Sequence, residues 1–169
     1  MRVLVQRVSE ARVTVADDEA GSIGAGLLLF VGIAATDSDT DSNLERRAMA
    51  DKIANLRIFE DRDHRMNRSA LDLVAAGDPV GALVISQFTL YGDVRKGRRP
   101  SFTRAAAPER AAPMIEDFAA CLASLGLTVE QGVFGAHMMV SLTNDGPVTI
   151  WIDSDDLRQS RRGEASSSI

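Results

Sequence analysis

The chain is poor in the residues that build metal centres and disulfides. It contains one cysteine and two histidines, and 5% of its 169 residues are aromatic. Cys121 alone cannot form an intramolecular disulfide and therefore suggests a reducing compartment. His64 and His137 lie too far apart in the sequence for the paired spacing of a zinc site, so we expect neither a metal ion nor another cofactor.

Long apolar segments are missing as well. No stretch of the sequence approaches the ~18 consecutive apolar residues of a membrane span. Residues 1–7 become polar too early for the apolar region of a signal peptide, so we expect a cytoplasmic protein without a membrane partner. The net charge of −5 argues against a protein that coats nucleic acid through overall positive charge, but it leaves room for a local basic patch.

The sequence predicts one α+β domain. Its 45% hydrophobic and 25% charged residues suit a single domain with a sizeable core. Strands are expected where apolar residues alternate with polar ones or run together between turns, namely within 1–35 and at 56–59, 80–88, 133–142 and 148–152. Helix-like spacing of apolar residues predicts helices at 39–55 and 108–125. We therefore expect a curved antiparallel sheet or barrel that is covered by two helices.

The domain is expected to span residues 1–152. Residues 153–169 are mostly polar and lack hydrophobic periodicity, which predicts a loose C-terminal tail. The last two expected strands are joined by a turn at Asn144–Gly146.

Polar residues follow the strongest strand pattern of the chain. Ser86, Gln87 and Thr89 come directly after the apolar run 82–85, as if a buried strand emerged at the rim of a pocket. Backbone N–H groups at such a strand end, together with hydroxyl and amide side chains, can stabilise a developing oxyanion. The alternative is that Ser86 and Thr89 lie on the solvent face of an ordinary strand.

No residue of this segment has an evident base beside it. A serine or threonine hydroxyl is a weak nucleophile unless a neighbouring base removes its proton. His64 fits a solvated loop and His137 an ordinary edge strand, so a Ser-His-Asp triad is not expected. Cys121 falls on the apolar face of the second predicted helix and is interpreted as a core residue.

Gly146 and Pro147 precede the last strand and allow two interpretations. Asn-Asp-Gly-Pro is an ordinary turn composition, and only about 5–6% of X-Pro bonds in folded proteins are cis. A cis bond would turn both carbonyls to one side and present a rigid backbone wall, which could exclude one hand of a chiral centre.

The segment 92–104 is strongly basic. It carries four clustered cations, Arg95, Lys96, Arg98 and Arg99, together with Arg104, against Asp93, so its net charge is +4 in an acidic chain. A solvated charged loop is one interpretation. Its closeness to Ser86 favours a contact with a phosphate backbone.

Taken together, Ser86–Leu90 and Asn144–Thr149 resemble the two motifs of the D-aminoacyl-tRNA deacylase family. Further similar segments occur in the same order along the chain: Gln6–Val8, Ile23–Leu28, Arg57–Phe59, Met66–Asn67, Arg99–Phe102 and Val140–Leu142. The resemblance covers residues 1 to about 152. His64 stands where the family usually has Gly, and His137 where an Asp is common, which affects the expected loop conformation and tRNA preference rather than the reaction.

The resemblance implies a barrel-like homodimer that hydrolyses the ester between a D-amino acid and the 3′ end of tRNA, and that also accepts mischarged glycyl-tRNA. Such chiral proofreading keeps D-residues out of translation. Gly146–Pro147 would be cis and inserted from one subunit into the other's pocket, where its carbonyls exclude L-amino acids. Arg7 would support this inserted pair. The pocket would be lined by Ser86, Gln87, Phe88 and Thr89.

Two mechanisms and two rival functions stay open. Either the terminal ribose 2′-hydroxyl of the tRNA helps to activate water, or Thr89 is the nucleophile, and the missing base beside Thr89 favours the first. A non-catalytic tRNA or DNA binding module would share the basic segment but would not need Gly146 and Pro147. A conventional serine or threonine esterase would act on small esters that lack a ribose.

Overall fold

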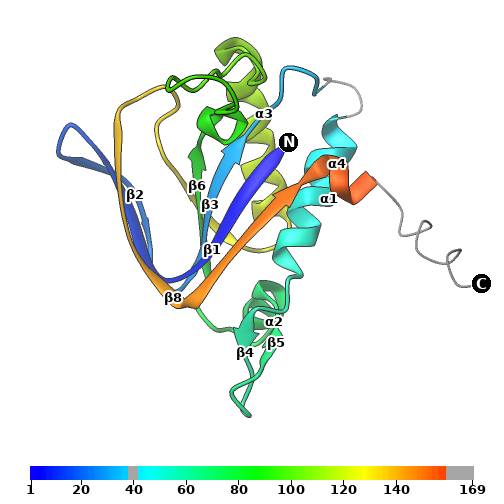
Figure 1. Cartoon of the computed structure of the whole chain (residues 1–169). Helices are drawn as coiled ribbons and strands as arrows, with labels where there is room; N and C mark the ends of the chain where they lie inside the picture. The colour runs from blue at the N-terminus through cyan, green and yellow to red at the C-terminus, as the bar shows by residue number, and fades with distance from the viewer. Residues whose placement is uncertain (38–41, 159–169) are drawn as a thin grey trace, which may run out of the picture.

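The computed structural model describes residues 1–37 and 42–158 as a strongly curled sheet with two long helices packed against it (Figure 1). The strands are β1 (Arg2–Val15), β2 (Asp18–Ile23), β3 (Gly26–Gly32), β4 (Phe59–Glu60), β5 (Met66–Arg68), β6 (Gly81–Ser86), β7 (Thr128–Gln131) and β8 (Met138–Asp153). The helices are α1 (Ser42–Ala54), α2 (Ala70–Ala75), the 3-10 turn η1 (Phe88–Tyr91), α3 (Pro108–Ser124) and α4 (Ser154–Arg158).

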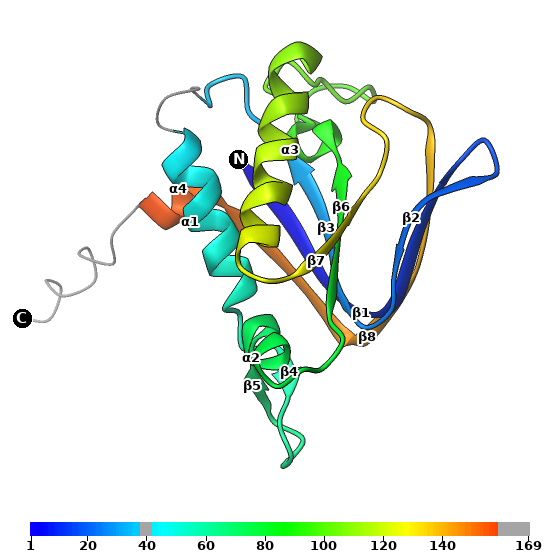
Figure 2. The same ribbon diagram turned by 180° about the vertical axis from the view of Figure 1, so that it is seen from behind.

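The long strand β1 organises the six-stranded sheet, whose order is β2-β1-β3-β6-β7 with β8 also paired to β1. The first half of β1 pairs with β3, its second half pairs with β2, and β8 follows it along both halves. Register shifts in the β1–β8 ladder between Gln6 and Glu10 mark a sharp bend. The two halves of the sheet therefore face each other across a barrel-like curl (Figures 1 and 2).

Two hydrophobic clusters fill the two faces of the sheet. Leu27, Leu29 and Val31 of β3 belong to the larger cluster, which α1 and α3 cover. Leu28 belongs to a smaller cluster inside the curl. Since β3 is buried on both faces, its sequence is a continuous apolar run instead of an alternating one. Phe118 of α3 is fully buried in the larger cluster.

The predicted fold class is confirmed: the chain is one α+β domain with a barrel-like sheet and two long helices. The sheet is mixed, however, and not purely antiparallel, because β3 pairs in parallel with β6 and β6 pairs in parallel with β7. Each of these connections contains a helix that returns the chain to the same end of the sheet, which is the usual requirement for parallel pairing. The expected helix at 39–55 corresponds to α1, but residues 39–41 lie outside the described part.

The end of the domain differs from the expectation in two ways. The predicted turn at Asn144–Gly146 is wrong, because β8 runs through it without interruption to Asp153. The predicted tail starts too early, because Asp153 pairs with Arg2 and α4 follows it. Residues 159–169 lie outside the described part.

A buried charge cluster holds both ends of this domain together. The amino group of Met1 lies 3.1 Å from Asp37 Oδ2 and 3.4 Å from Glu45 Oε1, and it donates a hydrogen bond of 2.5 Å to Ser154 Oγ. The contact joins the start of β1 to α1 and α4. Buried charges are retained only where such partners compensate the lost hydration.

The close approach of β3 to β6 gives a stability prediction. A Cβ at Gly26 would overlap the backbone carbonyl of Gly81, whereas a Cβ at Gly24 would meet nothing within 4 Å. We expect Gly26→Ala to lower the free energy of unfolding by about 3 kcal/mol, since overpacked sites of this kind force the backbone apart. Gly24→Ala is the control and should change it by less than about 0.5 kcal/mol. Equal midpoints in urea denaturation would contradict the close packing of these two strands.

Candidate active site

The candidate site begins where β6 leaves the sheet. Ser86 ends this buried strand, and the Gln87 N–H donates to the Val31 carbonyl at 2.7 Å before the chain turns into η1. The turn closes with the Gly92 N–H donating to the Thr89 carbonyl at 2.9 Å. The first N–H groups of a helical turn have no partner within it, so this edge of the sheet presents backbone donors.

Arg2 and Tyr91 fix η1 to the rest of the sheet. The guanidinium of Arg2 lies 4.5 Å from the ring centroid of Tyr91, and it donates to the Leu90 carbonyl at 3.0 Å and to Asp153 Oδ2 at 2.7 Å. Burial raises the pKa of the Tyr91 hydroxyl, and the charges of Asp37 and Asp153 raise it further. The turn that carries the predicted site residues is therefore held against β1 and β8.

A cavity of about 550 Å³ opens beside this turn. One wall is Ser86–Phe88, a second is formed by Phe102, Ala105 and the start of α3, and a third is the loop Phe134–Met138. Ile33, Ile85 and Ile115 contribute to its apolar lining. The cavity is thus largely apolar within and carries polar side chains at the end of β6 and at His137, which is a common design of small-molecule sites.

The structure brings three of the four predicted pocket residues to this cavity. Ser86, Gln87 and Phe88 line it, whereas Thr89 is exposed beside it and accepts a hydrogen bond from Gln87 Nε2. Within residues 1–37 and 42–158, no carboxylate or imidazole is hydrogen-bonded to the hydroxyl of Ser86 or Thr89. In this structure, neither hydroxyl therefore has a hydrogen-bonded base that could activate it.

His137 and Phe134 line the cavity although sequence reasoning assigned them no role there. They were missed because the sequence predicted a strand at 133–142. In the structure β8 begins only at Met138, and the preceding residues form a loop. Gly135, with a φ of +76°, marks that loop. Two glycines within four residues, Gly132 and Gly135, were the available signal.

Gly146 and Pro147 lie within β8 at its bend, and the peptide bond between them is trans. The structure therefore does not show the expected cis bond. Pro147 is exposed on the strand, and the trans isomer of an X-Pro bond is intrinsically favoured by about 0.5–1 kcal/mol. The backbone is special here for another reason: Gly146 has a φ of +102°, which side-chain-bearing residues rarely adopt.

Arg7 occupies the space beneath this corner. Its side chain is 5% exposed, its Nε lies 3.0 Å from Asp145 Oδ2, and its terminal nitrogen donates to the Ile58 carbonyl. A Cβ at Gly146 would collide with the guanidinium. Arg7 thus lies directly against Gly146 within one chain.

Asn144 ties the two sides of the corner together. Its amide nitrogen lies 2.9 Å from the carbonyl oxygen of Arg7 and 3.2 Å from that of Val148, and its amide oxygen accepts from Thr149 Oγ1 at 3.1 Å. These bonds span the segment that contains Gly146 and Pro147, so the exposed corner is held from both ends.

The corner and the cavity lie at opposite ends of the sheet. Ser86 pairs with Val31, which pairs with Val3, whereas Gly146 adjoins Arg7. Val3 and Arg7 are four residues apart on β1, roughly 13 Å along a strand, and three strand spacings of about 4.8 Å separate β6 from β8. One chain therefore does not bring Gly146–Pro147 to Ser86–Phe88.

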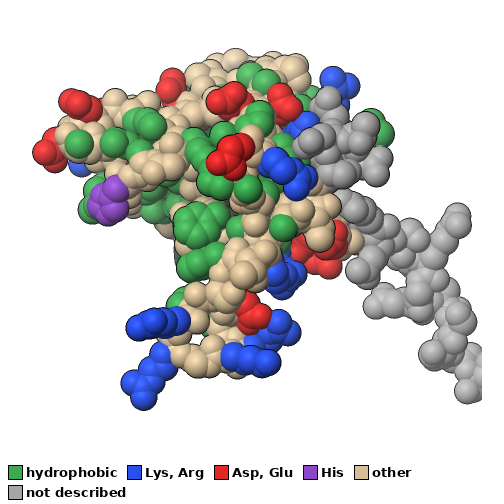
Figure 3. Space-filling model, turned by 90° about the horizontal axis from the view of Figure 1, so that it is seen from above, with side chains coloured by type: hydrophobic (Ala, Val, Ile, Leu, Met, Phe, Trp, Pro, Cys, Tyr) green, Lys and Arg blue, Asp and Glu red, His purple; other side chains and the backbone are tan. Residues whose placement is uncertain are grey.

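The basic segment 92–104 forms a protruding loop above the cavity. Lys and Arg gather on one lobe of the face shown in Figure 3. Arg95 is paired with Asp93 at 2.5 Å, and this hydrogen bond holds the pKa of Asp93 well below its usual range. Lys96, Arg98 and Arg99 are exposed.

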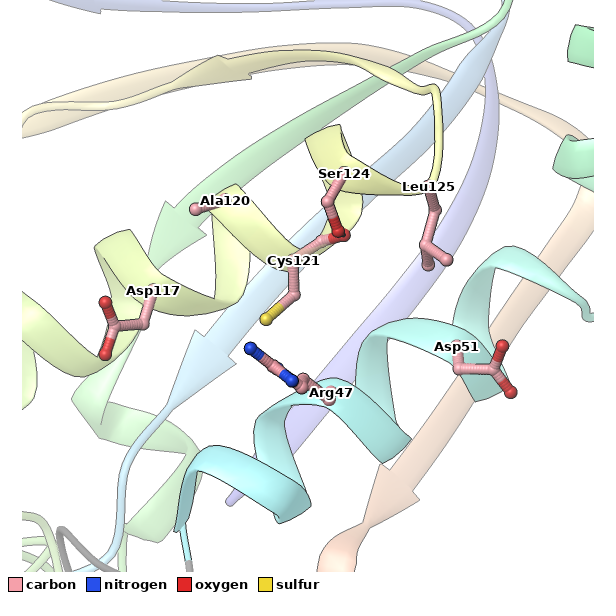
Figure 4. Close-up of a pocket in the computed structure, with 7 residues that line it drawn as sticks. All are labelled: Arg47, Asp51, Asp117, Ala120, Cys121, Ser124 and Leu125. Carbon is pink, nitrogen blue, oxygen red and sulfur yellow. The ribbon is translucent and has the colours of Figure 1, made fainter.

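A second, more open cavity of about 620 Å³ lies between α1 and α3 (Figure 4). The side chain of Arg47 on α1 points toward the thiol of Cys121 on α3. Cys121 is half-buried here and packs on the edge of the core. No group of three or more His, Cys, Asp or Glu that could hold a metal ion occurs in the described part of the chain.

A family model described as D-Tyr-tRNA(Tyr) deacylase matches residues 4–153. The chain belongs to this family. It is 56% identical to a D-aminoacyl-tRNA deacylase of Thermomicrobium roseum over 158 residues, which cover 94% of this chain and 97% of the relative. A D-aminoacyl-tRNA deacylase of Chloroflexus aurantiacus is 54% identical over 162 residues, which cover 96% of both chains.

Solved structures agree with the fold of the deacylase family. The structure of "c-Myc DNA Unwinding Element Binding Protein" is 36% identical with a TM-score of 0.78, and the match covers 90% of this chain and 98% of that one. A probable eukaryotic D-amino acid tRNA deacylase is 18% identical with a TM-score of 0.75 over 89% of this chain and 97% of that one, which shows the fold alone. The family and its relatives identify the chain as a D-aminoacyl-tRNA deacylase, an ester hydrolase.

The Arg7 contact makes Gly146 harder to substitute than other glycines with positive φ. We expect Gly146→Ala to destabilise the protein by about 2 kcal/mol or more, because backbone strain adds to a collision with a buried guanidinium. Gly77→Ala is the matched control, since Gly77 has a φ of +77° with open space around it and should show the strain alone, about 1 kcal/mol. Chemical denaturation measures both variants, and equal losses would show that Arg7 does not constrain Gly146.

Proposed function

We propose that this deacylase binds the aminoacyl end of D-aminoacyl-tRNA in the cavity beside η1, and that it also accepts glycyl-tRNA. The observation that carries the proposal is the position of Ser86, Gln87 and Phe88 at one edge of a largely apolar cavity. An amino-acid side chain fits the apolar interior, and the scissile ester then lies at the edge that carries hydroxyl, amide and backbone donors.

The chemistry proposed here is hydrolysis without a protein nucleophile. Water adds to the ester carbonyl, the oxyanion that forms is stabilised by backbone N–H groups at the start of η1, and the 3′-oxygen of the ribose leaves with a proton. The 2′-hydroxyl of the same ribose helps to activate the water. Thr89, held by Gln87, positions the ester or the water and does not attack, because no base adjoins its hydroxyl.

Selectivity against L-amino acids is proposed to come from a second copy of the chain. Gly146 and Pro147 form an exposed corner that Arg7 supports from below and that lies far from the cavity of its own chain. In a homodimer this corner enters the partner's cavity, where rigid backbone leaves no space for the L-arrangement of substituents. Exposed apolar side chains on β8, such as Leu142 and Trp151, suit burial between two copies.

The loop above the cavity is proposed to bind the acceptor end of the tRNA. Lys96, Arg98 and Arg99 place exposed positive charge beside the cavity, while the acidic remainder of the chain opposes non-specific binding. No helix within residues 1–37 and 42–158 is long and apolar enough to cross a membrane. A cytoplasmic location, where charged tRNA is used, fits the proposed substrate.

Deacylation of D-tyrosyl-tRNA and of L-tyrosyl-tRNA at equal enzyme concentration tests this proposal. We expect the D-ester to be lost at least about a hundredfold faster, since a steric clash costs several kcal/mol. Glycyl-tRNA, which has no chiral centre, should be hydrolysed as well. Equal rates on both tyrosyl esters would refute the proposed selectivity against L-amino acids, although the protein would still be an esterase.

The role of Thr89 can be separated from that of a nucleophile. We expect Thr89→Ala to lower kcat for D-tyrosyl-tRNA by about tenfold, because positioning is weakened but no covalent step is lost. Thr128→Ala is the control, since this exposed threonine lies on β7 and does not line the cavity. Complete inactivation of a folded Thr89→Ala variant, with an acyl-threonine trapped on the wild type, would establish nucleophilic catalysis instead.

A further inference from the structure

The guanidinium of Arg2 contacts aromatic rings of two different elements. Its Cζ lies 4.5 Å from the ring centroid of Tyr91 on η1 and 5.3 Å from that of Trp151 on β8. A cation over an aromatic face is attracted by the ring, and the attraction grows where water is partly excluded. The side chain of Arg2 is 18% exposed, so these contacts are partly shielded and tie η1 to β8.

The same guanidinium also binds the end of η1. It donates to the Leu90 carbonyl at 3.0 Å, and its Nε donates to Asp153 Oδ2 at 2.7 Å. The last carbonyls of a helical turn have no partner within the turn, and a nearby arginine can bind them. Asp153 Oδ1 accepts in turn from the Asp155 N–H at 3.1 Å. Arg2 therefore joins the end of η1 to a carboxylate whose own position is fixed.

The start of η1 is fixed by the sheet itself. Gly32 pairs with Arg2 in the β1–β3 ladder, and a Cβ at Gly32 would lie 2.9 Å from the Gln87 carbonyl oxygen. The backbone that leads into η1 thus packs directly on the end of β3, where the Gln87 N–H donates to the Val31 carbonyl at 2.7 Å. The turn has one anchor at Gln87, which backbone supplies, and one at Leu90, which a side chain supplies.

We propose that Arg2 is a positioning residue for deacylation. The inference rests on the proposed function, in which backbone N–H groups at the start of η1 stabilise the oxyanion. The N–H groups of Phe88 and Thr89 lie between the two anchors. Such donors stabilise a developing charge only when they are preorganised, so a turn with a loose end loses transition-state stabilisation. Arg2 does not line the cavity, and it therefore acts through η1.

Steady-state kinetics on D-tyrosyl-tRNA test this role. Arg2→Met keeps an unbranched apolar side chain beside the two rings but removes the charge and the donors. We expect it to lower kcat by about ten- to a hundredfold and to change KM by less than about twofold, because misplaced donors weaken the transition state more than binding. Arg2→Lys should lose less, since its ammonium keeps the charge but cannot bind Leu90 and Asp153 as a planar fork.

Two controls separate positioning from a general loss of stability. Arg12→Met makes the same change at an exposed residue of β1 that does not line the cavity, and it should leave both constants unchanged. Gly26→Ala lowers stability at the other end of β3 from Gly32. It should keep kcat when the rate is divided by the folded fraction that circular dichroism gives.

Amide hydrogen exchange reports on the turn directly. The Gly92 N–H donates to the Thr89 carbonyl at 2.9 Å and closes η1. In Arg2→Met this amide should exchange at least about tenfold faster, whereas the Gln87 N–H should keep its protection, because its partner lies in the sheet. Equal exchange of the Gly92 amide in both proteins would show that Arg2 does not hold the turn.

Four further results would overturn the role of Arg2. They are an unchanged kcat in folded Arg2→Met, a raised KM at constant kcat, which would place Arg2 in tRNA binding, an equal fall of kcat in Arg12→Met, and a weaker self-association of Arg2→Met in sedimentation, which would place Arg2 at an interface between copies. A wild type that does not hydrolyse D-tyrosyl-tRNA would instead refute the proposed function itself.

Discussion

The buried guanidinium of Arg7 is the contact on which the shape of the sheet depends. It lies where β1 and β8 bend, and it binds Asp145 on β8 and the Ile58 carbonyl ahead of β4. A buried charge must be satisfied by its surroundings, so these segments cannot separate without leaving it unpaired. The bend of the two strands and the exposed Gly146 corner are therefore held together by one side chain and its partners.

This arrangement places the predicted site residues of one chain at two separate ends of the sheet. β6 delivers Ser86 to the end where the cavity opens, while Arg7 and Gly146 lie at the other end. A rigid sheet cannot bring the two together, because its ladders fix their separation. Under the proposed function, a complete site needs a second copy of the chain. The selectivity of the site therefore depends on dimer formation.

The parts that sequence predicted best are those in which local pattern and tertiary structure agree. The amphipathic spacing of Ile115, Phe118 and Leu122 predicts α3, and the apolar run before Ser86 predicts β6. The parallel pairing of β3 with β6 could not be predicted, since nothing in either strand encodes its neighbour. The predicted turn at residue 146 was wrong for a related reason: Gly-Pro composition correctly indicates a corner, but β1 pairs with β8 on both sides of it, at Asn144 and Thr149, so the strand continues.

The cavity itself shows why composition hides a site of this kind. Under the proposed function, no residue in it needs an unusual pKa, a metal ion or a catalytic triad, so Ser86 and Gln87 resemble ordinary strand-end residues in the sequence. An aminoacyl ester is already labile, and orientation with oxyanion stabilisation supplies several kcal/mol without any strong catalyst. A strong nucleophile would also hydrolyse the L-aminoacyl esters that translation uses, because D- and L-aminoacyl esters contain the same reacting bond. Under the proposed function, discrimination therefore resides in shape, and the residues that supply this shape are the corner held by Arg7 and the residues that line the cavity.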